Sequence, residues 1–327
     1  MKKLKVLSLF SGIGAFEEAM DNLNISYELV NYCEFDKTIA KAYSLIHNVS
    51  IDKNLGDINN VDEKEIEDFD LMTYGFPCQS FSIAGKRLGF EDKEKGNLFF
   101  ESMRIAKYKK PKFMIAENVK GLINHNKGET FKTIISVLES LGYNNYYKVL
   151  RSCDFDIPQA RERIFIVSIR KDIDVDKKFN FIEGKLTNKT LADIIEDKPR
   201  KKVKNSLKKY LDEKYFVIDY KSEIGIKKLF DGCSEGYFTS SYTSNRIFSI
   251  NGISPTLTTK NDAVYYEIEG HLTSRERFKL QGFNPNYVDL LKSNGISNRY
   301  IDLMSGNSIT VNVVQSILKS LYESYIK

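Results

Sequence analysis

Short apolar runs alternate with helical patterns along the first half of the chain. Six runs have the length and composition of strands buried in a sheet. They are Lys5–Phe10, Tyr27–Glu34, Phe69–Tyr74, Phe113–Glu117, Tyr146–Leu150 and Arg163–Arg170. A helix is expected from the glycine turn after the first run to about Asn22, and Asp36–His47 and Thr130–Leu141 have helical spacing. Strands that alternate with helices predict an α/β fold with a doubly wound, mostly parallel sheet.

The pattern changes after about Lys171. Residues 172–230 are irregular and rich in lysine, and Lys198–Lys209 holds seven basic residues and no acidic one. Residues 233–270 are rich in Ser, Thr, Tyr, Asn and Gly, which is typical of loops and short strands. Helical signals return from Ser274, and Ser308–Ile326 predicts a closing helix. We expect a large domain over 1–180 completed by a C-terminal helix at 305–327, a smaller, irregular β-rich domain over 181–285, and a hinge at 286–304.

Composition narrows the class of protein. The 327 residues are 42% hydrophobic, which suffices for a sizeable core, and the net charge of +5 permits a polyanionic partner without requiring one. No apolar run is long enough to span a membrane, and MKKLKVLSLF turns to glycine too soon for a signal peptide. Four cysteines without a CxxC pair or a Cys/His cluster predict neither a disulfide framework nor a metal site. A reducing cytoplasm is the expected location.

A glycine turn, Phe10-Ser11-Gly12-Ile13-Gly14, follows the first strand. Glycines there let a ligand approach the backbone closely. A nicotinamide fingerprint would place a third glycine where Glu17 stands, and an acidic first helical turn repels a pyrophosphate. S-adenosylmethionine, which carries positive charge and no phosphate, suits this turn better. Glu34 ends the second strand at the position where a carboxylate binds ribose hydroxyls in doubly wound folds. A plain tight turn is the alternative.

Cys78 lies in Tyr74–Ser82, directly after a strand, and is therefore expected at the carboxyl edge of the sheet, where ligands bind. A nucleophilic thiol needs help to ionise near neutral pH. None of the three histidines, His47, His125 and His271, is near it in sequence, so a Cys–His hydrolase is disfavoured. The long polar loop Ser82–Asn97 is expected to act as a lid. A buried, inert thiol is the other interpretation of this cysteine.

Six short motifs, in this order along the chain, resemble those of the DNA cytosine-5 methyltransferases. They are Phe10–Gly14 (FSGIG), Pro77–Gln79 (PCQ), Glu117–Val119 (ENV), Gln159–Arg163 (QARER), Arg275–Gly282 (RERFKLQG) and Gly306–Asn312 (GNSITVN). The resemblance spans the chain except for about 172–240. One departure is Ser8, where many members carry Asp, and it affects only a detail of the cofactor pocket.

The resemblance implies a class I, Rossmann-like methyltransferase that methylates C5 of cytosine within a specific double-stranded DNA sequence. S-adenosylmethionine would be the methyl donor and S-adenosylhomocysteine the product, with no metal. The target base would flip into the site and bond covalently through C6 to Cys78. By the same resemblance Glu117 would contact the N3/N4 edge of cytosine and Arg163 its O2, with Arg161 supporting the loop or a phosphate. Structural ion pairs are the alternative for these three charged residues.

The resemblance also implies binding residues. The cofactor would contact Phe10, Gly12, Gly14, Glu34, Asp57, Ile58, Pro77, Leu98 and Asn307. On the DNA side, Gln79 would hold the duplex after the base has left, Ser82 would bind a phosphate, Arg246 would contact a guanine and Thr256 would belong to the recognition loop. The domain at 181–285 would be the target-recognition domain. Core packing is the alternative for Phe10 and Leu98, and the basic run is either a phosphate contact or a solvated helix face.

Four functions remain to be compared. The first is a bacterial or phage-type DNA methyltransferase, monomeric and associated with a restriction–modification system whose endonuclease acts separately. The same fold acting on tRNA is the second, and the variable region between Arg163 and Arg275 favours DNA. A catalytically inactive DNA-binding relative is the third, and it is disfavoured by the intact set of Cys78, Glu117 and Arg163. A nicotinamide oxidoreductase is disfavoured by Glu17.

Overall fold

The chain forms two compact units. The computed structural model describes residues 3–77, 98–200, 203, 205–212, 216, 225–232, 234, 243–259 and 263–326. The first unit comprises Met1–Leu150, Glu162–Ile182 and Gln315–Lys327, and the second comprises Arg151–Arg161 and Glu183–Val314.

These limits differ from the domains expected from the sequence. Residues 151–161 belong to the second unit because β6 (Gln159–Ala160) pairs there with β10 (Ser254–Pro255). Residues 286–304, expected as a hinge, form helices α7 and most of α8 because apolar side chains such as Val288 and Ile301 are fully buried. The closing helix α9 (Val311–Tyr325) begins later than expected, and it joins the first unit only from Gln315.

The first unit is built on a six-stranded sheet with the strand order β2-β1-β3-β4-β7-β5. β1 pairs in parallel with β2 and β3, and β3 pairs in parallel with β4, whereas β7 is antiparallel to β4. This sheet confirms the mostly parallel α/β fold predicted from the sequence. The strands are β1 (Leu4–Leu9), β2 (Tyr27–Cys33), β3 (Leu71–Tyr74), β4 (Phe113–Val119), β5 (Tyr143–Arg151) and β7 (Glu162–Arg170).

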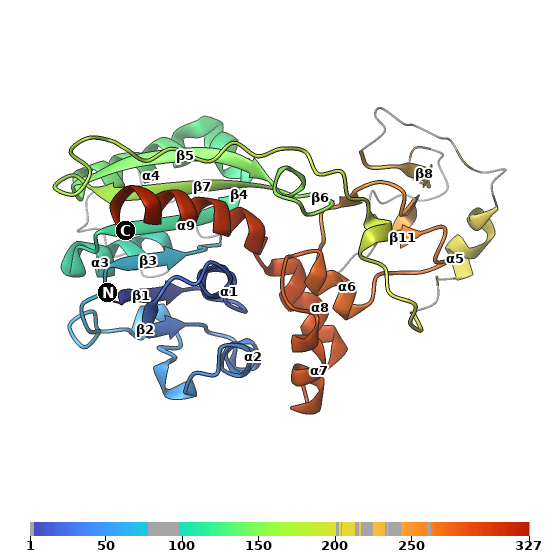
Figure 1. Ribbon diagram of the computed structural model, residues 1–327, viewed down its shortest axis with the longest axis horizontal. Helices are drawn as coiled ribbons and strands as arrows, with labels where there is room; N and C mark the ends of the chain where they lie inside the picture. The colour runs from blue at the N-terminus through green and yellow to red at the C-terminus, as the bar shows by residue number, and fades with distance from the viewer. Residues whose placement is uncertain are drawn as a thin grey trace. The chain divides into compact units, whose positions relative to one another are not determined.

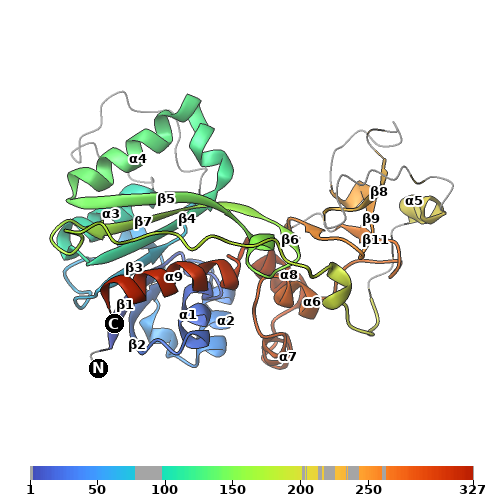
Figure 2. The same ribbon diagram turned by 45° about the horizontal axis from the view of Figure 1, so that its top comes forward.

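Helices cover both faces of this sheet. Figures 1 and 2 show α1, α2 and the C-terminal part of α9 on one face, and α3 and α4 on the other. The start of α2 is set by Asp36, whose carboxylate accepts hydrogen bonds from the backbone N–H of Thr38 and Ile39 at 2.7 and 3.1 Å. The bounds are α1 (Ala15–Asn22), α2 (Lys37–His47), α3 (Leu98–Lys109) and α4 (Glu129–Ser140).

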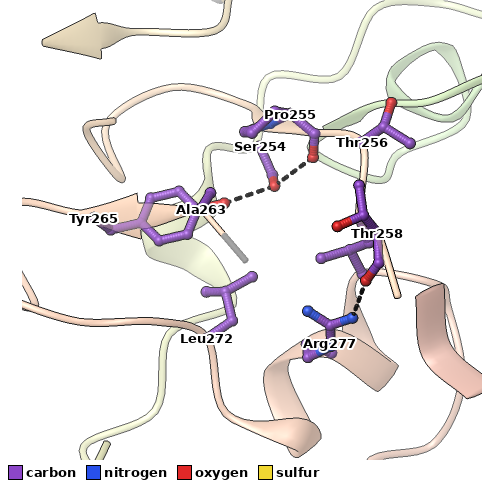
Figure 3. Close-up of a pocket in the computed structure, with 9 residues that line it drawn as sticks. Ser254, Pro255, Thr256, Thr258, Ala263, Tyr265, Leu272 and Arg277 are labelled. Atoms are coloured by element: carbon purple, nitrogen blue, oxygen red, sulfur yellow. Dashed lines mark hydrogen bonds between the residues drawn. The ribbon is translucent and has the colours of Figure 1, made fainter. Parts of the chain in front are cut away.

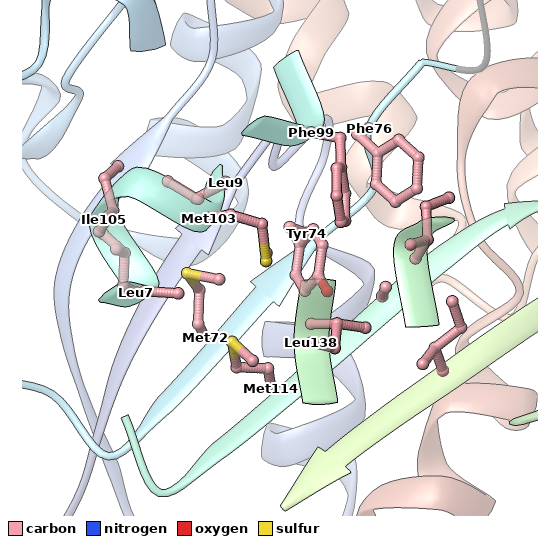
Figure 4. Packing of buried hydrophobic residues seen from close by; sticks show 14 of the residues in the cluster. Leu7, Leu9, Met72, Tyr74, Phe76, Phe99, Met103, Ile105, Met114 and Leu138 are labelled. Carbon is pink, nitrogen blue, oxygen red and sulfur yellow. The ribbon is translucent and has the colours of Figure 1, made fainter. Parts of the chain in front are cut away.

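The core between the sheet and helices α3 and α4 fixes the central strands. Figure 4 shows Met72 and Tyr74 of β3 packed with Phe99 and Met103 of α3 and with Leu138 of α4. All four residues of β3 are buried, as expected of a central strand that is covered on both faces. The segment that follows Tyr74 therefore starts from a strand that is packed on both faces.

A buried carboxylate fastens the C-terminal helix to the first unit. Asp174 is 1% exposed and accepts hydrogen bonds from the hydroxyls of Tyr146 and Tyr325 and from the Asn144 amide. The Tyr325 ring lies 5.9 Å from that of Phe113 in β4. Paired in this way, a buried charge is tolerated, and α9 is held against the sheet.

The second unit has short strands and helices. β10 and β6 form a two-stranded sheet, and β11, β9 and β8 form one of three strands. These strands are two to four residues long, and the β-rich character expected for 181–285 stays a prediction. The remaining elements are α5 (Asn205–Lys208), β8 (Lys228–Asp231), β9 (Arg246–Phe248), β11 (Val264–Tyr265), α6 (Ser274–Lys279), α7 (Asn286–Ser293) and α8 (Asn298–Asn307). None of the helices in the described ranges is both long and apolar enough to cross a membrane.

Candidate active site

The turn after β1 combines an unusual backbone with an open surface. Phe10, Gly12 and Gly14 have φ angles of +53°, +56° and +78°, and such a value is uncommon for a residue with a side chain such as Phe10. A β-carbon at Gly14 would lie 2.0 Å from the imidazole of His47, whereas one at Gly12 would meet no described atom within 4 Å. Gly14 is thus required for packing, and the backbone at Gly12 is accessible to a ligand.

Glu34 follows the end of β2 and is tied to this turn. Its carboxylate accepts hydrogen bonds from the backbone N–H of Gly12 at 3.1 Å and of Asp36 at 3.0 Å. Burial raises the pKa of the Glu34 carboxyl above its usual range, and these two hydrogen bonds oppose that rise. Each carboxylate oxygen has a further lone pair, so the group can still accept hydrogen bonds from ligand hydroxyls.

Asn54 couples Glu34 to the next segment that carries a predicted cofactor residue. The Asn54 side chain accepts from the backbone N–H of Glu34 and Gly56 at 2.9 and 3.1 Å and donates to the Glu34 carbonyl at 3.0 Å. Asp57 follows directly and caps a short 3-10 helix by accepting from the N–H of Asn59. Glu34 and Asp57 are therefore held in a fixed relation by one amide side chain.

The other predicted cofactor residues of the first unit have mixed environments. Ile58 is only 2% exposed and packs in the core, so its side chain does not face a ligand. Leu98, the first residue of α3, and Phe10 are partly buried against the same core. Pro77 is exposed. Core packing thus accounts for much of the surface of Ile58, Leu98 and Phe10.

One exposed aromatic residue was missed by the sequence analysis. Phe35 follows Glu34 directly and is 77% exposed, the highest value among the exposed large hydrophobic residues of the described chain. An exposed aromatic ring beside a carboxylate that is predicted to bind ribose is suited to stack on a flat heterocycle. The sequence did contain a signal, because an aromatic residue stands between two carboxylates, Glu34 and Asp36, after a strand has ended.

The segment that leads to Cys78 is anchored beside β4. Phe76 is 2% exposed, and its carbonyl accepts a hydrogen bond of 2.7 Å from the side chain of Asn118. The described chain stops at Pro77, so the predicted nucleophile Cys78 and the predicted DNA contacts Gln79 and Ser82 lie outside the described residues, as does the expected lid. The last described residues before Cys78 are nevertheless fixed to the end of β4 by the hydrogen bond between Asn118 and Phe76.

Glu117 and Arg163 form an ion pair at this end of the sheet. The Nε of Arg163 lies 3.0 Å from Oε1 of Glu117, and the two side chains are 19% and 12% exposed. In the antiparallel register Glu117 is opposite Phe165 and Val119 is opposite Arg163, so the pair is a diagonal one on the same face. A β-carbon at Gly75 would lie 3.8 Å from the Glu117 carboxylate. The ion pair is thus adjacent to the segment that leads to Cys78.

Arg161, two residues before Arg163, has a different environment in the second unit. It is 3% exposed and donates hydrogen bonds to the carbonyls of Ser308 at 2.7 Å and Leu257 at 3.4 Å. Gln159 is fully buried, accepts from the N–H of Leu257 and donates to the carbonyl of Leu280. Arg161 therefore braces backbone segments, which corresponds to the supporting role among those considered for it.

The predicted DNA contacts of the second unit have partners within the protein. Thr256 donates to the carbonyl of Ala160 at 2.8 Å, and Nε of Arg246 pairs with Asp231 at 2.9 Å. The residues around Thr256 border a cavity of about 10 Å³, room for roughly one water molecule. Figure 3 shows the hydrogen bond between Ser254 and Tyr265 on one side of this cavity and Arg277 on the other. The hydrogen bonds of Ser254 and Thr256 thus hold segment 254–258 in place within the second unit.

The basic run Lys198–Lys209 is partly neutralised inside the second unit. Arg200 pairs with the buried Glu276 at 2.6 Å, and Lys198 lies 3.5 Å from Glu196. The Arg200 guanidinium is therefore largely enclosed within the unit, whereas the Lys198 side chain is 50% exposed. Asn307, the predicted cofactor residue of this unit, is exposed at the end of α8. Within the described ranges, no group of three or more His, Cys, Asp or Glu side chains is arranged to hold a metal ion.

The chain resembles known proteins both in sequence and in fold. A sequence model of the family described as C-5 cytosine-specific DNA methylase matches residues 4–323. The orphan methyltransferase M.SPRI of Bacillus phage SPR is 38% identical over 284 residues, which cover 79% of this chain and 64% of that protein. The type II methyltransferase M.HhaI of Haemophilus parahaemolyticus is 32% identical over 282 residues, 85% of this chain and 80% of that one.

The length and the fold complete the comparison. The chain spans less than two thirds of the length of two phage relatives, 64% of M.SPRI and 58% of M.Rho11sI of Bacillus phage rho11s. Among solved structures, the Entamoeba histolytica methyltransferase EhMeth matches with a TM-score of 0.72 at 16% identity, covering 99% of both chains. The S. pombe Dnmt2 methyltransferase matches at 0.66 and 18%, covering 98% of this chain and 99% of that one. At such identities these structures speak for the fold alone.

Proposed function

The chain belongs to the C-5 cytosine-specific DNA methylase family, and on this premise we propose that it methylates C5 of cytosine within a specific sequence of double-stranded DNA. The observation that carries the proposal is the Glu117–Arg163 ion pair at the end of β4, next to the anchored segment that leads to Cys78. An acid and a guanidinium next to the segment that leads to a thiol would form a set of groups able to bind and activate a pyrimidine.

The residues around the glycine turn fit an adenosyl cofactor. Glu34 offers a carboxylate for the ribose hydroxyls, Gly12 leaves the backbone open, and Phe35 presents an exposed ring. Asp57 and the neighbouring backbone would hold the adenine side, with Leu98 and Pro77 as apolar neighbours. When bound, S-adenosylmethionine would supply an electrophilic methyl group, and S-adenosylhomocysteine would remain as the product.

The protein groups would act on the base in a defined order. C5 and C6 of a stacked cytosine are not accessible, so the base must first leave the duplex. The Cys78 thiolate would then add to C6, which makes C5 nucleophilic. After C5 has gained the methyl group, loss of the C5 proton and elimination of Cys78 would restore the aromatic ring.

Glu117 and Arg163 would hold the base during this sequence. A carboxyl group of Glu117 that shares a proton with N3 would make the ring more electrophilic, and the Arg163 guanidinium would stabilise negative charge at O2. Before the base arrives, the two side chains neutralise each other at 3.0 Å. This pairing keeps two largely buried charges compensated without a ligand.

The second unit would read the DNA sequence. Arg246 would contact a guanine while Asp231 orients its guanidinium, and segment 254–258 with Thr256 would form part of the recognition surface. Gln79 and Ser82 would contact the DNA from the loop after Cys78. We further propose that the protein acts as a monomer in a restriction–modification setting, where any cognate endonuclease would be a separate protein.

A methyl-transfer assay tests the proposed function directly. Purified protein is incubated with S-adenosylmethionine and either genomic duplex DNA or bulk tRNA, and the DNA is then analysed by bisulfite sequencing. We expect cytosines within one short sequence to become resistant to conversion, and the same DNA without cofactor to remain unmodified. Methylation of tRNA alone, or no methylation of either substrate, would contradict the proposal.

Replacing Glu34 by alanine is expected to weaken cofactor binding. Loss of a charged acceptor for ribose hydroxyls should raise the dissociation constant of S-adenosylhomocysteine by about ten- to a hundredfold. Isothermal titration calorimetry measures this change. Glu28→Ala is the matched control because Glu28 is an exposed carboxylate in β2, the strand that directly precedes Glu34. Equal affinity of the Glu34→Ala variant and the unchanged protein would refute the ribose contact.

A further inference from the structure

Arg104 in α3 has four contacts, and three of them lie on one segment of the first unit, residues 58–63. Its Nη2 donates to the backbone carbonyls of Ile58 at 3.2 Å and Val61 at 2.9 Å. Its Nη1 pairs with Glu63, and its Nε donates to Glu101 of the same helix at 2.8 Å. A single guanidinium therefore fastens residues 58–63 to α3.

The segment that Arg104 holds carries one wall of the proposed cofactor site. The Ile58 carbonyl belongs to the residue that directly follows Asp57, and Asp57 caps the short 3-10 helix Ile58–Asn60. The helix that bears Arg104 begins at Leu98, which is another proposed cofactor contact. Arg104 thus connects two elements that would face the adenosyl group from different parts of the chain.

The opposite end of the same segment is held independently. Asn54 binds the backbone of Glu34 and Gly56 through three hydrogen bonds. Residues 54–61 are therefore fixed at one end to the backbone of Glu34 and at the other to α3. Without Arg104, only the Asn54 end would retain these side-chain hydrogen bonds, and the C-terminal side of Asp57 would be restrained mainly by the core packing of Ile58 and Val61.

The geometry requires a guanidinium. Arginine has five N–H donors in a planar fork, whereas lysine has one ammonium at the end of a flexible chain. The Arg104 side chain is 32% exposed and both carboxylates are 21% exposed, so the pairs are shielded from solvent in part. A lysine could keep one carboxylate contact, but it could not bridge two carbonyls and two carboxylates at once.

We propose that Arg104 is a positioning residue for cofactor binding: it fixes segment 57–61 against α3 so that Asp57 and its neighbouring backbone are preorganised for the adenosyl group. This inference rests on the proposed function. Arg104 itself would not touch the ligand. It would still contribute to the affinity for the ligand, because a displacement of about 1 Å in the residues that line a binding site weakens binding.

Calorimetry with S-adenosylhomocysteine tests the proposal on the full chain. We expect Arg104→Gln to weaken binding by about tenfold, and Arg104→Lys to weaken it by at least about threefold. The matched control is Lys109→Gln, which removes a positive charge and an ion pair to Asp68 from the same helix. This control should bind the ligand within about twofold of the unchanged protein.

A kinetic measurement separates positioning from a general loss of structure. For Arg104→Gln, KM for S-adenosylmethionine should rise about tenfold, while kcat at saturating cofactor stays within about twofold. A loss of folded protein would instead lower kcat at an unchanged KM. If Arg104→Gln does not fold, Arg104→Lys decides the matter, and full affinity in a folded Arg104→Lys variant overturns the proposal.

The failure of this inference is distinguishable from that of the proposed function. If the unchanged protein does not bind S-adenosylhomocysteine, the proposed cofactor is wrong and the positioning role falls with it. If the unchanged protein binds and both Arg104 variants bind equally well, only the positioning role is overturned. Weaker binding by the Arg104 variants together with full binding by Lys109→Gln supports it.

Discussion

Replacing Cys78 by serine is expected to abolish methyl transfer, with a loss on the order of 10⁴-fold or more. A serine hydroxyl ionises far less readily than a thiol, so the group that adds to C6 is lost. Duplex DNA binding should persist, because it depends on other contacts. The segment before Cys78 is also anchored independently, through the Phe76 carbonyl and the Asn118 side chain. Tritium transfer from labelled cofactor and a gel-shift assay measure the two properties.

DNA that contains 5-fluorocytosine tests the same role of Cys78, because it should trap a covalent complex between the protein and the base. Fluorine at C5 cannot leave as a proton does, so Cys78 should remain attached to C6 after methyl transfer, and a mass spectrum should show the adduct. Cys78→Ser should give no adduct. Cys153→Ala is the control, since Cys153 is a buried cysteine of the second unit. Full turnover by Cys78→Ser would remove this thiol from the mechanism.

The hydrophobic pattern predicted all six strands of the large sheet but not the direction of each. Every residue of β3 is buried, and β1 and β4 are nearly so, which is why apolar runs revealed them. An apolar run in the sequence does not indicate whether a strand is parallel or antiparallel to its neighbour in the sheet. The antiparallel pairing of β7 with β4 depends on long-range contacts, and it is this pairing that brings Arg163 to Glu117.

Some features were missed although the sequence contained part of the signal. Helix α3 was not predicted, yet Phe99, Met103 and Ala106 recur at helical spacing and are buried. Arg104 lies between those apolar positions, and the sequence analysis did not single it out. Its partners, the carbonyls of Ile58 and Val61, are more than 40 residues away in the chain, so no local pattern could identify them.

The two arginines of QARER show a further limit of sequence reasoning. Arg161 and Arg163 are two residues apart, and in one uninterrupted strand they would share a face. The strand is instead interrupted between β6 and β7, and Arg161 donates to backbone carbonyls of the second unit. Arg163 in the first unit pairs with Glu117. The resemblance named both residues, but only the hydrogen bonds show that Arg161 braces the backbone whereas Arg163 pairs with Glu117.

Exchanging Glu117 for glutamine is expected to lower kcat by about 10²- to 10³-fold, the range typical of a lost acid–base group. Glutamine has nearly the same shape and retains a hydrogen-bonding carbonyl, but it cannot share an acidic proton with N3. Binding of S-adenosylhomocysteine should be unchanged, because Glu117 lies at the Gly75–Phe76 segment and is not among the groups proposed to bind the cofactor. Single-turnover methyl transfer on duplex DNA measures the effect on chemistry separately from product release.

Glu162→Gln provides the matched control for this prediction. Glu162 precedes Arg163, is 39% exposed and pairs with Lys120 at 3.0 Å. Glu162→Gln therefore removes the same charge one residue from Arg163, but from a solvated ion pair, and should change the rate by no more than about twofold. If both variants lost activity equally, the effect would reflect the net charge around Arg163. A large loss in Glu117→Gln alone would instead locate the acid function at Glu117, where the carboxylate and Arg163 are positioned before a base arrives.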